Sequence, residues 1–155
     1  MELFYLVGQI SPKFPESYDW RNWMEEEFAD EPAINFINPC RNNFNKKVLE
    51  EKRYAVTKDK RSFGIDVLPP KDRAFVERSA GCIVNLNQYD PSKELLGTYY
   101  EMAWYFDSPS KTVIGFADDL NSYPCQHPFV KQTVHCWCEN KEQAAYVLQK
   151  YFINR

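Results

Sequence analysis

Residues 71–87, KDRAFVERSAGCIVNLN, contain the pattern that decides the fold: a charged stretch followed by an uninterrupted apolar run. We expect a helix over residues 72–79, entered through Pro69 and Pro70, and a strand over residues 82–87. A continuous apolar run differs from the alternating pattern of a strand that faces solvent on one side. It is typical of a strand buried on both faces in a parallel sheet.

Strands and helices are expected to alternate along the rest of the chain as well. Four further apolar runs predict strands, over residues 3–7, 33–37, 111–116 and 133–137. Three further stretches predict helices, over residues 18–28, 97–106 and 141–152. Ser17 and Asn140 are expected to cap the first and the last of these helices. The whole pattern predicts an α/β fold in which helices cover both faces of a five-stranded, mainly parallel sheet.

The length of 155 residues corresponds to a single domain, and no shift in composition marks a linker or a second domain. Residues 40–70 interrupt the alternation with an irregular, charged stretch in which we expect one short helix. Loops of this length inside a domain are usually functional or mobile. We expect this excursion either to cover a pocket or to form a contact between subunits.

Composition excludes several classes of protein. The 19 basic and 22 acidic residues give a net charge of −3, so no basic excess indicates binding to nucleic acid or to a membrane surface. No apolar run approaches the roughly 20 residues that span a bilayer. The five cysteines form an odd set without an export signal, which favours a cytoplasmic location. Aromatic residues reach 16% of the chain, and they could fill the core, an oligomer interface or a pocket that stacks a flat ligand.

Ligands of parallel sheets bind at the carboxyl ends of the strands. The candidates for a binding site are therefore the residues that follow the expected strands: Gly8, Gln9, Asn38, residues 85–89 and the loop into Gly97. No GxxxxGK[ST] or GxGxxG motif supports a P-loop or a dinucleotide site, and no GxSxG motif supports a serine hydrolase. We expect no cofactor.

Two acidic residues near helix starts have both a catalytic and a structural interpretation. Glu101 follows Gly97 and Thr98 in the first turn of an expected helix, where amide dipoles keep a carboxylate ionised and glycine lets a ligand approach. This arrangement suits a carboxylate nucleophile that attacks a sugar carbon. Thr98-x-x-Glu101 is also a capping box, which the spacing alone favours. Asp72 could exchange a proton with a leaving group if burial raises its pKa, or it could only stabilise its helix start.

Cysteine and histidine also lie close together near the C-terminus, as zinc ligands do. The residues are Cys125, His127, His135, Cys136 and Cys138. The Cys-x-Cys spacing is not that of a zinc knuckle, and on a strand His135 points away from both neighbouring cysteines. We expect no metal site.

Taken together, these segments resemble the nucleoside 2-deoxyribosyltransferase family. The matching stretches are FYLVGQIS (4–11), INP (37–39), KDRAFVERSAGCIVNLN (71–87), LLGTYYEMAWYF (95–106), KTVIGF (111–116) and HPFVKQTVHCW (127–137). The resemblance covers nearly the whole chain apart from residues 40–70. Its specific part is the combination of an aspartate helix, a strand that ends in NLN and a GTxxE helix.

The resemblance implies a flavodoxin-like, three-layer fold and cleavage of the N-glycosidic bond of 2′-deoxynucleosides. In this family a glutamate attacks C1′ to form a deoxyribosyl ester, which an incoming base or water then resolves. By position, Glu101 matches this nucleophile and Asp72 matches the acid that hydrogen-bonds the departing base. Tyr5 matches the tyrosine that orients the glutamate, and Gln9 falls, after Gly8, in the turn that lines the base pocket.

Further candidates for substrate binding follow from position in the expected fold. Asn85 and Asn87 lie at a strand end, where they could hydrogen-bond a substrate or simply terminate the strand. Gly97 and Thr98 open the helix that carries the glutamate.

The chain departs from the family just before Gly97, where Leu95 and Leu96 replace the usual Asp or Ser that hold the sugar hydroxyls or a 5′-phosphate. Sugar recognition is therefore expected from Glu94, from Ser92 or from a neighbouring subunit. The expected partners are a nucleoside, a nucleobase and further copies of the chain, with no nucleic acid and no membrane. Two alternatives remain: a 2′-deoxynucleoside 5′-phosphate N-hydrolase, and a non-catalytic nucleotide-binding or sensing module.

Overall fold

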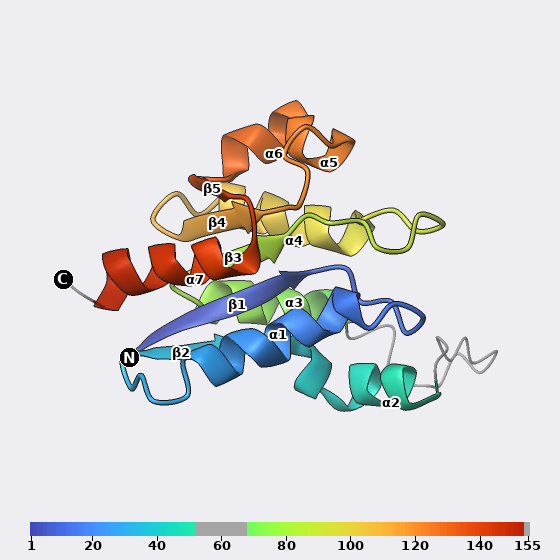
Figure 1. The fold of residues 1–155 in the computed structure, drawn as a ribbon, viewed down its shortest axis with the longest axis horizontal. Helices are drawn as coiled ribbons and strands as arrows, with labels where there is room; N and C mark the ends of the chain where they lie inside the picture. The colour runs from blue at the N-terminus through green and yellow to red at the C-terminus, as the bar shows by residue number, and fades with distance from the viewer. Residues whose placement is uncertain (52–67, 154–155) are drawn as a thin grey trace.

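The apolar runs form a parallel sheet at the centre of the protein (Figure 1). The computed structural model describes residues 1–51 and 68–153. Its strands are β1 (Glu2–Gly8), β2 (Ile34–Ile37), β3 (Gly81–Asn85), β4 (Thr112–Phe116) and β5 (Cys136–Cys138). They lie in the order β2-β1-β3-β4-β5, and every neighbouring pair is parallel. Because this is the strand order of flavodoxin-like folds, the expected α/β architecture is confirmed.

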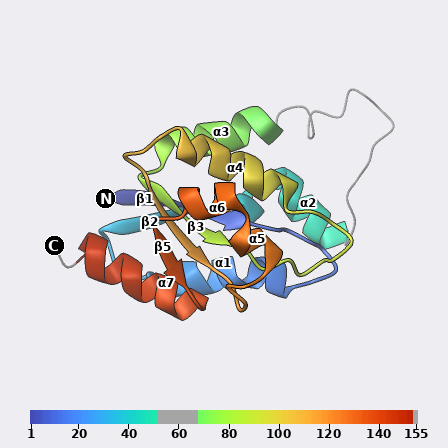
Figure 2. The ribbon, with the colours of Figure 1, turned by 90° about the horizontal axis from the view of Figure 1, so that it is seen from above.

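Helices cover both faces of this sheet (Figure 2). The longer ones are α1 (Glu16–Glu27), α3 (Leu68–Arg78), α4 (Leu96–Phe106) and α7 (Lys141–Leu148). Residues of α1 and α7 pack on one face, and residues of α3 and α4 pack on the other. The shorter α5 (Tyr123–Gln126) and α6 (Pro128–Thr133) extend the α4 layer toward β5, and a π-helical turn (Gln149–Ile153) follows α7.

Side chains of β1 alternate between the two layers, which explains why its sequence is apolar without interruption. Phe4 and Leu6 face the α1 and α7 layer, whereas Tyr5 and Val7 face the α3 and α4 layer. All four side chains are at most 1% exposed. Since both faces are covered, any polar atom at these positions needs a partner inside the protein. The Tyr5 hydroxyl is such an atom.

One of the two expected helix caps is confirmed and the other is wrong. Asn140 caps α7, because its side chain accepts a hydrogen bond from the Gln143 amide at 2.8 Å. Ser17 lies inside α1, whose N-cap position is held by Pro15. The Ser17 hydroxyl instead accepts a hydrogen bond from the Ser11 amide at 2.8 Å and thereby closes the loop after β1.

Prolines lie in the first turns of α3, which starts earlier than expected, and of α5 and α6, which were not expected. Pro69 and Pro70 lie inside the first turn of α3, so this helix starts four residues before position 72. Pro124 and Pro128 lie in the first turns of α5 and α6. Proline is tolerated there because its missing N–H would have no helical partner. The strand expected over residues 133–137 begins later, because α6 extends to Thr133 and β5 runs over Cys136–Cys138.

The expected excursion over residues 40–70 is partly helical. A 3-10 helix (Pro39–Arg41) and α2 (Asn43–Glu51) form its first part. Residues 52–67 of the excursion lie outside the described residues. Among the helices of residues 1–51 and 68–153, none combines the length and the apolar character needed to cross a membrane.

Candidate active site

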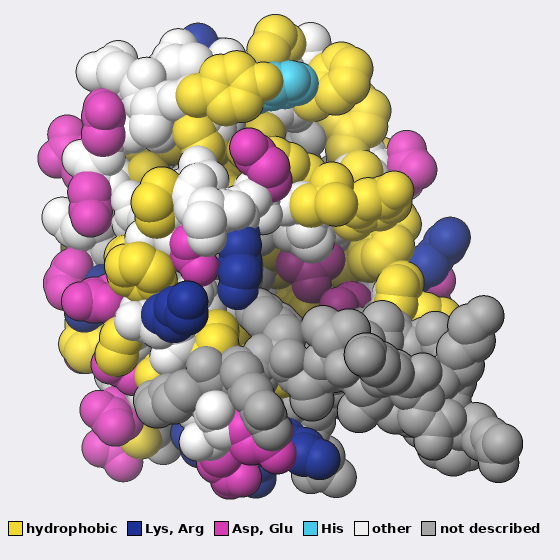
Figure 3. All heavy atoms as spheres, turned by 90° about the vertical axis from the view of Figure 1, so that its right-hand side faces the viewer, with side chains coloured by type: hydrophobic (Ala, Val, Ile, Leu, Met, Phe, Trp, Pro, Cys, Tyr) yellow, Lys and Arg dark blue, Asp and Glu magenta, His cyan; other side chains and the backbone are white. Residues whose placement is uncertain are grey.

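A cavity of about 240 Å³ lies at the carboxyl end of β1, where parallel sheets bind ligands. Its walls come from β1 and the loop after it, from α1, α2 and α3, and from the start of α4 with the loop before it. Of the residues expected to form the site, seven line this cavity: Tyr5, Gly8, Gln9, Asp72, Gly97, Thr98 and Glu101. Asn38, residues 85–89 and Ser92 do not line it. Figure 3 shows this edge of the protein, where acidic side chains lie in a hollow between hydrophobic ones.

Glu101 and Tyr5 meet at the bottom of the cavity. Glu101 lies in the second turn of α4 and is 8% exposed, and Tyr5 lies in the middle of β1 and is 1% exposed. The Tyr5 hydroxyl donates a hydrogen bond to Oε1 of Glu101. The buried hydroxyl of β1 and the buried carboxyl of α4 thus satisfy each other, although 96 positions separate them in the chain.

The expected capping box at the start of α4 is wrong. The helix begins at Leu96 with Leu95 in the N-cap position, and no side chain caps it. Thr98 is therefore already the third helical residue, and Glu101 lies one turn too far into the helix to bond the N-cap amide. For the same reason Glu101 is outside the first turn, where helix amides stabilise a carboxylate most strongly. Its partner is Tyr5 instead.

Burial shapes the ionisation of both carboxyl groups of the cavity. Burial raises the pKa of Glu101 to about 8, and the negative charge of Asp72 adds to the rise, while the Tyr5 hydrogen bond and the charge of Arg21 oppose it. Burial also raises the pKa of Asp72 to about 6, against a smaller lowering by Lys71. Burial and the neighbouring Glu101 charge raise the pKa of Tyr5 well above its usual value, so this phenol stays a donor. Two carboxyl groups with raised and separated pKa values are a recurrent feature of acid–base sites.

Gly8 and Gln9 form one wall of the cavity. A β-carbon at position 8 would lie 3.0 Å from the Asn85 carbonyl oxygen, and the φ angle there is +156°, so both space and conformation favour glycine. The Gln9 amide bonds the opposite loop: its Oε1 accepts from the Asp90 N–H at 2.8 Å, and its Nε2 donates to the carbonyls of Asp90 and Lys93 at 3.3 and 3.2 Å. Gln9 therefore lines the cavity and, through these hydrogen bonds, connects the loop after β1 to the loop before α4.

The start of α4 and the loop before it form the opposite wall. Gly97 is exposed, and a β-carbon there would meet no atom within 4 Å, so this position leaves room at the mouth of the cavity. Thr98 is buried in the wall. Leu95 is buried and lines the cavity, whereas Leu96 is 62% exposed and does not. Glu94 also lines the cavity.

Asn85 and Asn87 lie at the end of β3 and outside the cavity. Their side-chain amides donate to the Tyr89 hydroxyl at 3.1 and 3.3 Å, and their side-chain oxygens accept from the backbone amides of Asn87 and Asp118. Ser92, expected as a possible sugar ligand, donates to Asp90 at 2.5 Å and is not part of the lining. These contacts match the alternative in which the asparagines organise the strand end.

Sequence reasoning missed Arg21, which is fully buried in α1 and lines the cavity. The signal lies in its spacing, because Arg21 follows the buried Ser17 by four residues and precedes the buried Met24 by three. These spacings place an arginine on the buried face of a helix.

No protein-family model and no curated protein matches this chain. The function must therefore be argued from the geometry of the cavity.

The cysteines and histidines near the C-terminus hold structural positions. The His127 Nδ1 atom accepts a hydrogen bond from the Phe129 amide at 3.3 Å and caps α6. The His135 Nδ1 atom accepts one from the Val113 amide at 3.0 Å, next to β5. Across residues 1–51 and 68–153, no three His, Cys, Asp or Glu side chains are grouped as metal ligands.

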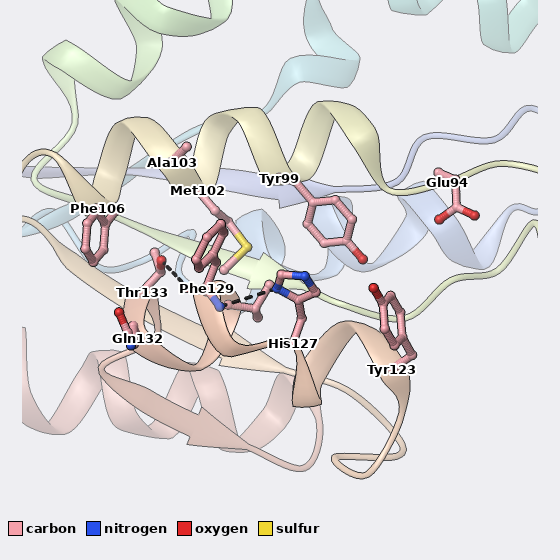
Figure 4. Close-up of a pocket in the computed structure, with 11 residues that line it drawn as sticks. Glu94, Tyr99, Met102, Ala103, Phe106, Tyr123, His127, Phe129, Gln132 and Thr133 are labelled. Atoms are coloured by element: carbon pink, nitrogen blue, oxygen red, sulfur yellow. Dashed lines mark hydrogen bonds between the residues drawn. The ribbon is translucent and has the colours of Figure 1, made fainter.

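A larger cavity of about 600 Å³ lies between α4 and the α5–α6 segment (Figure 4). Its lining is mainly apolar and aromatic and includes Met102, Phe106 and Phe129, and Tyr99, Tyr123 and Glu94 lie at one end of it. Glu94 is the residue that lines both cavities. Because Glu101 and Asp72 line only the smaller cavity, we place the candidate active site there.

Proposed function

We propose that the protein cleaves the N-glycosidic bond of 2′-deoxynucleosides and transfers the deoxyribosyl group, through a covalent ester on Glu101, to another base or to water. The observation that carries this proposal is the buried Glu101 carboxyl, hydrogen-bonded by Tyr5, in a cavity that also contains Asp72. A cavity with a nucleophilic carboxylate and a second carboxyl as proton donor is what glycosyl transfer requires.

In the first step, a carboxylate oxygen of Glu101 attacks C1′, and the bond between C1′ and the base nitrogen breaks. The electron pair of that bond goes to the base, and Asp72 in its acid form donates the proton that the departing base needs. C1′ passes through an oxocarbenium-like state, whose positive charge the Glu101 carboxylate stabilises before the ester forms. Tyr5 holds the carboxyl group in place through its hydrogen bond.

In the second step, a nitrogen of the incoming base attacks C1′, and the ester bond between C1′ and the Glu101 oxygen breaks. The electron pair returns to the Glu101 carboxylate, and the Asp72 carboxylate accepts the proton that the incoming base loses. When water attacks instead of a base, the product is free 2-deoxyribose and the reaction is hydrolysis.

The cycle begins with Glu101 ionised and Asp72 protonated, so the pair must carry one proton. With pKa values of about 6 and about 8, it does so across the neutral range. In the empty cavity that proton is mainly on Glu101, the more deeply buried group. A base that packs against Asp72 removes water from it, which raises the pKa of Asp72 and favours the arrangement that starts the reaction.

Specific observations favour the two alternatives. Lys93 lines the cavity with a side chain that is 40% exposed, where it could meet a 5′-phosphate, as a nucleotide N-hydrolase requires. The apolar Leu95 in the wall favours a module that binds nucleotides without turnover. Parallel assays with a deoxynucleoside and with its 5′-phosphate separate these alternatives from the proposal, because the binding module turns over neither compound.

We further propose that the protein forms a homo-oligomer through the surface around α4 and α6. Large apolar side chains are exposed there: Leu96 (62%), Tyr100 (61%), Phe106 (56%), Tyr123 (71%) and Phe129 (78%). Clustered exposed aromatic residues are typical of interfaces. We also propose a cytoplasmic location, because all five cysteines are unpaired, as they are in a reducing compartment.

The test of the function is base exchange. The protein is incubated with a 2′-deoxynucleoside and a second free base, and the exchanged nucleoside is measured by chromatography. We expect exchange in the wild type and none in Glu101→Gln, and we expect a deoxyribosyl adduct on the peptide that contains residue 101. Full activity of Glu101→Gln would exclude this residue as the nucleophile.

A further inference from the structure

Arg21 is a buried cation beneath the wall formed by Gly8 and Gln9. Its side chain is fully buried. Its Nε donates to the Leu6 carbonyl at 3.1 Å and its Nη2 to the Gly8 carbonyl at 2.8 Å. Its Nη1 donates to the carbonyls of Gln9 and Ser17 at 3.4 and 2.8 Å. The guanidinium group therefore binds the end of β1 and the following turn to α1.

The charge of Arg21 is not neutralised by a nearby carboxylate. Among residues 1–51 and 68–153, no Asp or Glu lies within ion-pair distance of it. Carbonyl oxygens satisfy its N–H groups but carry no net charge, and the Trp20 ring beside it, 4.8 Å from the guanidinium carbon, is neutral as well. A buried charge that lacks a partner acts over a longer distance than a solvated one.

Glu101 and Arg21 are both buried and line the same cavity, and the charge of Arg21 lowers the pKa of Glu101. The ionisable groups whose charges interact with Glu101 come from every element packed around it: Tyr5 of β1, Cys82 of β3, Asp72 of α3, Tyr105 of α4 and Arg21 of α1. Arg21 is the cation in this set. The other members are neutral or become negative, so they do not stabilise a negative charge on Glu101 through their own charge.

We propose that Arg21 is a positioning residue of the active site: its buried positive charge stabilises the ionised form of Glu101, and its four hydrogen bonds hold the turn that forms one wall of the cavity. This inference rests on the proposed function for its role in catalysis. The two parts can be separated, because lysine keeps the charge but has a single nitrogen and cannot reproduce the planar fork. Methionine removes the charge and all four bonds and keeps an unbranched, apolar side chain.

The test is the titration of Glu101 itself. Glutamate carboxyl carbons are labelled with 13C, the Glu101 resonance is identified by its absence in Glu101→Gln, and its midpoint is measured by NMR. We expect Arg21→Met to raise this midpoint by about one pH unit, as the loss of a neighbouring opposite charge does. Arg21→Lys is expected to stay close to the wild type, and Arg78→Met, which removes an exposed arginine of α3, is the matched control for net charge.

A second readout is the pH dependence of kcat/KM for base exchange. A rise of one unit leaves about a tenth of the ionised Glu101 at neutral pH, so Arg21→Met should lose about tenfold in kcat/KM there. Circular dichroism verifies folding, and Arg21→Gln replaces Arg21→Met if the latter does not fold. An unchanged midpoint in a folded neutral variant would overturn the inference. A Glu101 midpoint that rises by a full unit in Arg21→Lys would also overturn the inference, because this variant keeps the positive charge.

The NMR readout needs no turnover, so the two proposals can fail separately. A raised midpoint in Arg21→Met together with no base exchange by the wild type would refute the proposed function and leave the electrostatic part of the inference standing. Base exchange by the wild type together with an unchanged Glu101 midpoint in Arg21→Met would support the proposed function and refute the electrostatic part of the inference.

Discussion

Replacing Glu101 by glutamine should stabilise the protein, and by more at alkaline pH than at acidic pH. Burial raises the pKa of Glu101 from 4.5 to about 8 in the folded state. Between these values the folded protein binds a proton that the unfolded chain has lost. The free energy of unfolding of the wild type therefore falls as the pH rises through this window. Glutamine has nearly the same shape and does not titrate, so the variant lacks this loss.

The size of the stabilisation expected for Glu101→Gln follows from the rise in the pKa of Glu101. Each pH unit corresponds to about 1.4 kcal/mol, so a rise from 4.5 to about 8 corresponds to roughly 4 to 5 kcal/mol above pH 8. Some of this gain is lost, because the glutamine side chain of the variant offers the Tyr5 hydroxyl a weaker, uncharged acceptor, by about 1 kcal/mol. We expect a net gain of about 3 kcal/mol at pH 8.5 and almost none at pH 4.5.

The assay is urea denaturation of the wild type and of Glu101→Gln at pH 4.5, 6.5 and 8.5. The quantity of interest is the difference between the two free energies of unfolding, and its increase with pH. Glu142→Gln is the matched control, because this glutamate of α7 has a side chain that is 60% exposed and its carboxylate stays hydrated in both states. A Glu101→Gln difference that does not change with pH would refute the conclusion that this carboxyl is buried in a site that opposes its charge.

Three further variants test other parts of the site. Tyr5→Phe removes a hydrogen bond to a charged group, worth about 1.5 to 3 kcal/mol, so the titration midpoint of Glu101 measured by NMR should rise by about one to two units. Asp72→Asn should slow base exchange by a factor of about 10² to 10⁴, and a deoxyribosyl donor whose leaving group needs no proton should restore the rate; failure of this rescue would argue against Asp72 as the acid. Phe129→Glu places a charge on the exposed α6 surface and should lower the mass measured by light scattering, and an unchanged mass would exclude this surface as the interface.

The parallel sheet could be predicted because its signal is local in the sequence. Residues 82–84 and 4–7 are consecutive apolar runs, and both faces of these strands are covered by helices in the structure. A strand with one solvated face would have shown alternation instead. The helix boundaries were less predictable near proline, because proline is tolerated both in a loop and in the first turn of a helix, as at Pro69 and Pro128. Tertiary packing decides between these states.

The candidate site could be predicted only in part, because its contacts join distant segments. The resemblance to deoxyribosyltransferases picked out Tyr5 and Glu101, but the pattern GTxxE by itself favoured a capping box. The helix begins at Leu96, one residue earlier than expected, so Leu95 and not Thr98 holds the N-cap position, and Glu101 bonds Tyr5 of β1. Arg21 escaped notice because a single arginine among polar and acidic residues gives no sign that it is buried until Ser17 and Met24 are placed on the same helix face.

The distribution of buried charge is the strongest physical reason to expect chemistry at this edge of the sheet. The layer between the sheet and α1 with α7 is apolar along Phe4, Leu6 and Ile83. By contrast, the carboxyl end of β1 buries Glu101 and Arg21 around one small cavity and places Asp72 beside them. Burying a carboxyl group that must give up its charge costs free energy, and so does burying a cation that has no carboxylate within ion-pair distance among residues 1–51 and 68–153. Such groups are characteristic of sites where a reaction uses them, whereas the larger cavity beside α6 has a mainly apolar lining without Glu101 or Asp72.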